Sequence, residues 1–171
     1  MQDVAHAAGV HVQTLYLAYG TKAALLHETA SRRVAEGEDQ SVPPRERKWV
    51  REIIATDDPR EKLRLYVRHV RNISELWAPI RDVMREARDE PDVAERLAAM
   101  EYGRYEGPLN LLPPVHRAGQ IRKGLSVEKA AQMTYAIASP DTFIQLRERG
   151  MSWKQAEATV LDILTRSILG D

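Results

Sequence analysis

The side chain whose position suggests chemistry most directly is Lys22, which follows Thr21 at the expected start of a helix. Threonine often caps helix N-termini, so Lys22 would place a cation in the first turn, where the helix dipole disfavours it by roughly 0.3–1 kcal/mol. A phosphate would remove this penalty, because the first-turn N–H groups and the ammonium group can bind the same anion. A solvated lysine is the alternative interpretation. The choice depends on the elements that position Lys22.

Other residue types that could do chemistry do not form a recognisable set. The five histidines lack the H-E-x-x-H spacing or another close metal-ligand spacing. Glycine-rich phosphate loops and nucleophile elbows are also missing from the sequence. We therefore expect no metal, no cofactor and no catalytic residues, and we keep a small all-α enzyme as an alternative.

Composition limits the class of protein further. The chain has 171 residues, 25 Lys+Arg against 25 Asp+Glu, and no cysteine, which excludes a disulfide framework and a cysteine nucleophile. Its apolar runs are far shorter than a membrane span or a signal-peptide core. We expect a soluble, cytoplasmic protein with no membrane partner. The zero net charge hides local differences: residues 1–44 carry −2, residues 45–88 carry +4 and residues 89–171 carry −2.

Apolar residues recur at spacings of three and four along nearly the whole chain, which predicts an all-α fold. The pattern from Leu63 to Trp77 predicts one amphipathic helix, and the pattern after Pro79 predicts another that begins at this proline. Pro108 is expected to kink or end the following helix, and the stretch from Pro113 to Gly124 is expected to break the helical pattern.

Three more helices are predicted in the C-terminal part, beginning near Ser126, Pro140 and Ser152. The last of them carries apolar residues on more than one face, so it needs cover from its own domain and from a second surface. This pattern marks the last helix as a candidate subunit interface. The interface candidates are Met133, Ile137, Leu161, Leu164 and Ile168.

The N-terminal unit has the skeleton of a helix-turn-helix. A helix ending at Ala8, a turn at Gly9 and a helix from Val12 to Tyr19 place two short helices around one glycine turn, and a third helix begins at Lys22. The segment GEDQSVPPRER, residues 37–47, is the predicted linker. We expect a helix-turn-helix domain with its connecting helix in residues 1–40, and a larger helical bundle in residues 45–171.

The run VAHAAGVHVQTLYLAYGTKAALL, residues 4–26, resembles the DNA-binding signature of tetracycline-repressor (TetR-like) transcriptional regulators. The resemblance rests on the turn at Gly9, the Thr14-Leu15-Tyr16 core, the aromatic Tyr19, and Lys22 before Ala-Leu-Leu. Members of that family carry a further helix before the position of Met1, which this chain is expected to lack. The resemblance implies that DNA is contacted by His11, Gln13, Thr14, Tyr16, Leu17 and Lys22.

The resemblance also implies a ligand-responsive regulator, in the first place a repressor, in which residues 45–171 form the ligand-binding and dimerisation domain. Two recognition helices of a homodimer would read a pseudo-palindromic operator in double-stranded DNA, and a small, largely apolar effector would release it. A helical protein-binding adaptor is the other alternative function. The expected pocket is aromatic and apolar with one or two polar contacts, and its candidate residues are Tyr66, His69, Trp77, Met84, Met100, Tyr102, Tyr105 and Phe143.

Overall fold

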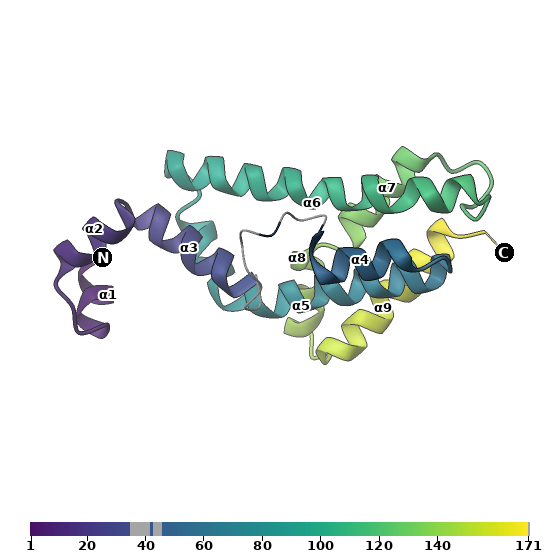
Figure 1. Ribbon diagram of the computed structural model, residues 1–171. Coiled ribbons are helices and arrows are strands. Elements are labelled where there is room, and N and C mark those ends of the chain that lie inside the picture. The colour runs from purple at the N-terminus through teal and green to yellow at the C-terminus, as the bar shows by residue number, and fades with distance from the viewer. Residues whose placement is uncertain (35–41, 43–45, 171) are drawn as a thin grey trace.

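The computed structural model describes residues 1–34, 42 and 46–170 (Figure 1). These residues confirm the predicted all-α class, since their β-type pairing amounts to an isolated bridge between Ile121 and Leu169. The N-terminal helices are α1 (Gln2–Ala7), α2 (Val12–Tyr19) and α3 (Lys22–Val34). The body holds α4 (Lys48–Ala55), α5 (Pro59–Glu86), α6 (Pro91–Arg117), α7 (Val127–Ile137), α8 (Pro140–Glu148) and α9 (Trp153–Ile168).

Helix α5 is the centre of the arrangement. It packs against α3, α4, α8 and α9, while α6 packs against α7 along its C-terminal part and against α3 near its start. Figure 1 shows α6 running along one side of the body, and α1 and α2 at the far end from α7 and α9. The helix-turn-helix unit therefore reaches the body through α3.

The predicted helix starts in the C-terminal part are confirmed by their caps. The Ser126 hydroxyl accepts a hydrogen bond from the Lys129 N–H at 3.2 Å, which fixes the first turn of α7. Ser139, just before Pro140, accepts from the Thr142 N–H at 3.1 Å. Ser152 forms a reciprocal capping box with Gln155, with donor–acceptor distances of 3.2 and 2.7 Å.

The prediction that Pro79 begins a new helix is wrong, and Pro108 does not end its helix, while the predicted break between Pro113 and Gly124 comes only after Arg117. Pro79 lies inside α5 and begins no new helix, and Pro108 and the pair that follows it lie inside α6. A proline inside a helix costs about 3 kcal/mol. Packing offsets this cost, because the apolar face of α5 continues beyond Pro79 into buried Ile80 and Met84. Tertiary contacts therefore outweigh the low helix propensity of proline at these positions.

Buried apolar residues form two clusters. The larger one holds helices α5, α6, α7, α8 and α9 together. Its side chains without exposed surface include Leu63, Leu112 and Phe143. The smaller one joins α3 to the end of α5 and the start of α6 through Ala23, Met84, Ala87 and Val93. The predicted linker, residues 37–47, lies almost wholly outside the described residues, so the division into residues 1–40 and 45–171 stays a prediction.

The predicted dimer-interface residues differ in exposure. Leu164 and Ile168 have no exposed surface and belong to the larger cluster, so they serve the core of the protomer. Met133, Ile137 and Leu161 are partly buried and pack against the same cluster. Only these last three keep surface that a second protomer could cover, and their role in an interface stays a prediction.

Candidate nucleic-acid interface

The turn between α1 and α2 is closed by Gly9. Its φ of 66° lies in the left-handed region that favours glycine. The Gly9 N–H donates to the His6 carbonyl at 3.1 Å, and the Val10 N–H donates to the Ala5 carbonyl at 3.0 Å. These bonds satisfy carbonyls that the end of α1 would otherwise leave free. Buried Ala5 on α1 and Leu15 on α2 then hold the two helices together.

The first turns of α2 point their polar side chains into solvent. His11 is the N-cap residue, and its side chain makes no capping hydrogen bond. Gln13 and Thr14 are exposed, and Leu17 is 89% exposed one turn further along. A leucine so exposed contributes nothing to the core, so this face of α2 is available for contact with another molecule.

The N-terminus of α3 has the geometry that the sequence predicts for Lys22. Gly20 turns the chain with a φ of 73°, and the Thr21 hydroxyl accepts a hydrogen bond from the Ala24 N–H at 3.0 Å. Lys22 is the exposed first residue of the helix, and its ammonium group makes no hydrogen bond or ion pair within the described part of the chain. Helix N–H groups and a free cation therefore lie at one exposed position.

The net charge of the three N-terminal helices is more favourable for binding an anion than the net charge of −2 for residues 1–44. Residues 1–34 hold three basic and two acidic side chains, and the other three acidic residues of the block are Glu36, Glu38 and Asp39, beyond α3. Arg32 is bonded to Glu28 at 2.6 Å, so its charge is locally balanced. Among the side chains of this unit that the structure describes, Lys22 is a cation without an ion pair.

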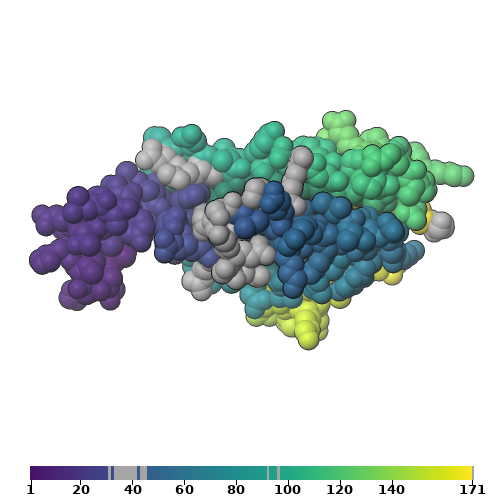
Figure 2. All heavy atoms as spheres, in the orientation of Figure 1, coloured from purple at the N-terminus to yellow at the C-terminus, as the bar shows by residue number. Residues whose placement is uncertain are grey.

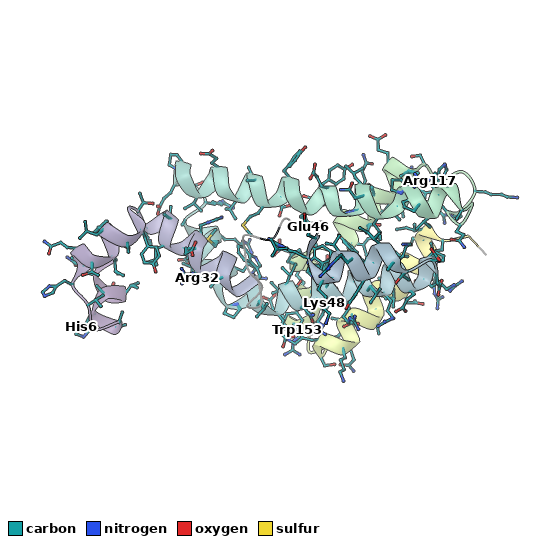
Figure 3. The ribbon with its side chains drawn as sticks, viewed as in Figure 1. His6, Arg32, Glu46, Lys48, Arg117 and Trp153 are labelled. Carbon is teal, nitrogen blue, oxygen red and sulfur yellow. The ribbon has the colours of Figure 1, made fainter. Side chains whose placement is uncertain are left out.

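The unit projects from the rest of the molecule. In the space-filling view the N-terminal helices form a lobe at one end (Figure 2), and His6 lies at its tip while Arg117 lies near the opposite end (Figure 3). The lobe is tied to the body by α3, whose Ala23 and Leu26 pack in the smaller cluster with Met84 and Val93. A flat or grooved partner can approach α2 without meeting the body.

The predicted pocket residues are distributed over several places. Tyr66 and Phe143 lie in the larger cluster, whereas Trp77 and Met84 lie in the smaller cluster beside α3. Tyr102 is 69% exposed. The remaining three candidates are partly buried: Met100 on α6, Tyr105, which packs edge-to-face on Tyr135, and His69, which stacks on Trp49. The eight residues thus lie in different parts of the body, and their role in a pocket stays a prediction.

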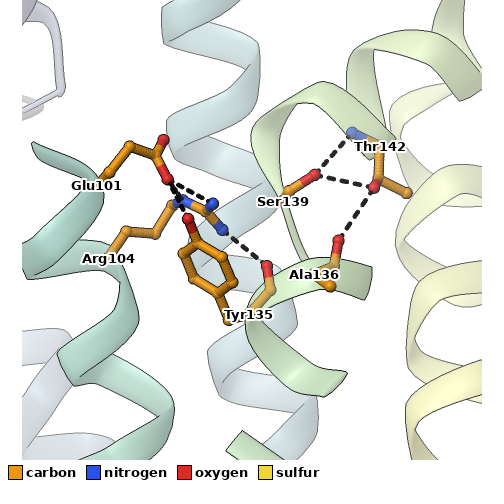
Figure 4. Close-up of polar contacts among 6 residues, drawn as sticks. All are labelled: Glu101, Arg104, Tyr135, Ala136, Ser139 and Thr142. Carbon is orange, nitrogen blue, oxygen red and sulfur yellow. Dashed lines mark hydrogen bonds and ion pairs between the residues drawn. The ribbon is translucent and has the colours of Figure 1, made fainter. Parts of the chain in front are cut away.

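Two features of the body were not predicted from the sequence. One is α4, whose Trp49 stacks on the His69 ring with centroids 3.6 Å apart and an interplanar angle of 13°. The other joins α6 to α7 (Figure 4): Arg104 donates to Glu101 and to the Tyr135 carbonyl at 2.7 Å each and lies over the Tyr135 ring. The i,i+3 pair of Glu101 and Arg104 is visible in the sequence, but Tyr135 is not adjacent.

The described residues hold no group of three or more potential ligands placed to bind a metal ion. None of the helices described has both the length and the apolar content needed to span a membrane.

Comparison with known proteins yields a structural likeness. No protein-family model matches the chain, and no curated protein matches its sequence. A crystal structure of a Rhodococcus sp. protein, named for the TetR family of transcriptional regulators, matches with a TM-score of 0.64 and 16% sequence identity. The match covers 97% of this chain and 86% of that chain. The chain therefore has the fold of a TetR-family transcriptional regulator.

Proposed function

We propose that this protein is a DNA-binding transcriptional regulator of the TetR type, which acts as a homodimer and responds to a small molecule. The observation that carries the proposal is the projecting pair of helices α1 and α2: the second helix exposes the polar side chains of its first turn, and exposed Lys22 follows its end at the start of α3. A helix presented in this way fits the major groove of B-DNA. The likeness to the Rhodococcus protein supports the same reading.

Some of the proposed contacts bind phosphates and position the protein on DNA, and the others recognise bases. Lys22 would bind a phosphate together with the first N–H groups of α3, and half-exposed Tyr16 would bind another. His11, Gln13 and Thr14 lie at the start of α2, where side chains of a recognition helix reach base edges. Exposed Leu17 can make apolar contact with a thymine methyl group.

A homodimer follows from the geometry of DNA reading. One protomer presents one recognition helix, and two such helices about one turn of DNA apart read a pseudo-palindrome. We place the interface on the outer face of α9, together with the end of α7. Ile163 is 43% exposed there, and Leu161 is partly exposed beside it. Light scattering at micromolar concentration is expected to give twice the mass of 19.4 kDa, and a monomer would contradict this part of the proposal.

The decisive experiment measures DNA binding by the full chain on the region upstream of its own gene. Lys22→Ala is expected to weaken binding to all sequences about equally and to lower the slope of log affinity against log salt by about one. Lys154→Ala is the matched control, because Lys154 is also an exposed lysine in the first turn of a capped helix, α9. Equal effects of the two variants would refute the assignment of Lys22.

Gln13→Ala tests the reading of bases separately from the binding of phosphates. It is expected to change the order of preference among operator variants, with a cost of about 1–3 kcal/mol at the base pair that Gln13 contacts. Wild-type protein that binds no DNA in a sequence-specific way would instead favour a protein-binding adaptor.

A further inference from the structure

One side of α2 is exposed and carries no charged side chain. Leu15 is buried and holds the helix against α1. Gln13 and Leu17 are each two positions from Leu15, so they lie on the opposite side of the helix, one turn apart. Thr14 and Ala18 are also exposed and lie beside them. These four residues, which we call the exposed face of α2, present an amide, a hydroxyl and apolar groups to solvent.

Leu17 is the most unusual member of this face. Its exposed fraction of 89% is the largest among the exposed large apolar side chains of the described residues. Contact of such a side chain with water is unfavourable, and it contributes no packing to the interior. A partner that covers Leu17 would therefore gain from the contact.

The charges around the exposed face favour a polyanionic partner. Residues 4–27 contain no aspartate or glutamate, and Lys22 follows α2 as an exposed cation. DNA phosphates would meet no repulsion from this segment while the uncharged face lies against the bases. An apolar protein partner would account for Leu17 but not for the missing acidic residues.

The residue types of the exposed face select among base pairs. Guanine is most often read by arginine or lysine, and cytosine is read by aspartate or glutamate. Helix α2 contains none of these four residue types. The Gln13 amide makes no hydrogen bond within the described residues, and a glutamine amide can bond both N7 and the N6 amino group of adenine. Leu17 and the methyl group of Thr14 can pack against the C5-methyl group of thymine.

We propose that α2 reads A·T base pairs, with Gln13 bound to an adenine and Leu17 packed on the methyl group of a nearby thymine. One helical turn is about 5.4 Å and base pairs are about 3.4 Å apart, so the adenine and the thymine lie within about two base pairs. This inference rests on the proposed DNA-binding function and deepens it, because it names the base pairs that the operator contains opposite α2.

The test begins with a pool of duplexes that have a random central segment, from which the full chain selects its preferred sites. The selected half-sites are expected to contain neighbouring A·T pairs. The selected duplex is then prepared with uracil in place of thymine, which keeps the base pairing and removes only the C5-methyl group. Fluorescence anisotropy is expected to show about three- to fivefold weaker binding for each methyl group that Leu17 covers.

Leu17→Ala is expected to bind the thymine duplex more weakly and to lose most of the difference between thymine and uracil. The substitution leaves the interior unchanged because Leu17 is exposed. Ile54→Ala is the matched control, since it shortens another exposed apolar side chain, on α4, and is expected to keep the full wild-type difference. Replacing adenine by 7-deazaadenine, which lacks the N7 acceptor, is expected to weaken binding by the wild type but not by Gln13→Ala.

Three results would contradict the inference while leaving the proposed function intact. They are selected half-sites without neighbouring A·T pairs, equal binding of the thymine and uracil duplexes by the wild type, and an undiminished thymine–uracil difference in Leu17→Ala. A pool that yields no preferred sequence would instead refute the proposed function, and this inference with it. The two kinds of failure are therefore distinguishable.

Discussion

The burial of His69 makes the stability of the helical body depend on pH in a window where most other groups do not titrate. The pKa of this imidazole is lowered from 6.5 to about 4 in the folded chain, first by burial and then by the charge of Arg47. Between these values the unfolded chain binds a proton that the folded chain does not. The free energy of unfolding therefore rises with pH across the window, and the protein loses stability on acidification from pH 6.5 towards 4.

The size of the effect follows from the two pKa values. Proton linkage gives a loss of about 2 kcal/mol in the free energy of unfolding between pH 7 and pH 5, which is a large part of the stability of a typical domain. Carboxylates contribute later in the titration. Burial disfavours the ionised form of Glu101, but hydrogen bonds from Arg104 and Tyr135 outweigh this and lower its pKa below 4.5. Stability from Glu101 is present above that value and is lost only as the pH falls below it.

Urea unfolding at pH 7, 6 and 5 measures the dependence directly. His69→Phe keeps a ring against Trp49 and removes the titrating group, so its stability is expected to vary less with pH than that of the wild type by about 2 kcal/mol over the same range. His116→Phe, at an exposed position on α6, is the control and is expected to retain the wild-type dependence. Parallel pH profiles for the wild type and His69→Phe would refute the assignment of His69 as the buried neutral group.

Two further predictions concern stability. Gly103 lies inside α6, where an added Cβ would meet no atom within 4 Å. Because alanine favours a helix more than glycine does, Gly103→Ala is expected to raise the free energy of unfolding by about 0.5–1 kcal/mol. Thermal unfolding measures this, and an unchanged midpoint would contradict it. Lys62→Met removes the ammonium group that bonds the last carbonyls of α4 and is expected to cost about 1.5–3 kcal/mol in urea unfolding, while Lys48→Met, at the exposed start of α4, is expected to cost far less.

The N-terminal unit could be predicted from the sequence because its determinants are local. Gly9 follows α1 in the left-handed conformation, which costs glycine little because it has no Cβ atom. Thr21 caps α3 by accepting a hydrogen bond from the Ala24 N–H, three positions away. The same holds for the serine caps at positions 126 and 152, which the structure places where the sequence does. In each case the residue type and its neighbours within one helical turn determine the structure.

The body was predicted less well because its determinants are distant in the sequence. Pro79 opposes the helix locally, and only the burial of Met84 against α3 explains why α5 continues. The aromatic residues expected in the pocket are chemically similar but lie in different places. Trp77 packs in the cluster with α3, whereas Tyr66 packs against α6. Residue types identified candidates for a site, whereas the tertiary contacts decided which of them are neighbours.

Helix α5 connects the interior of the body to α3, which carries the helix-turn-helix unit. Tyr66 lies about 27 Å along α5 from Met84, at a rise of 1.5 Å per residue, and Met84 packs in the cluster that holds α3. A small molecule bound between α5 and α6 would change the contact of Tyr66 with α6 at Gly107, and both helices meet α3 at their other ends. Because a ligand shifts an equilibrium only through differential contacts with two states, the two states would have to differ in how α5 and α6 are spaced at Gly107. The position of α3, and with it the recognition helix α2, would follow that spacing.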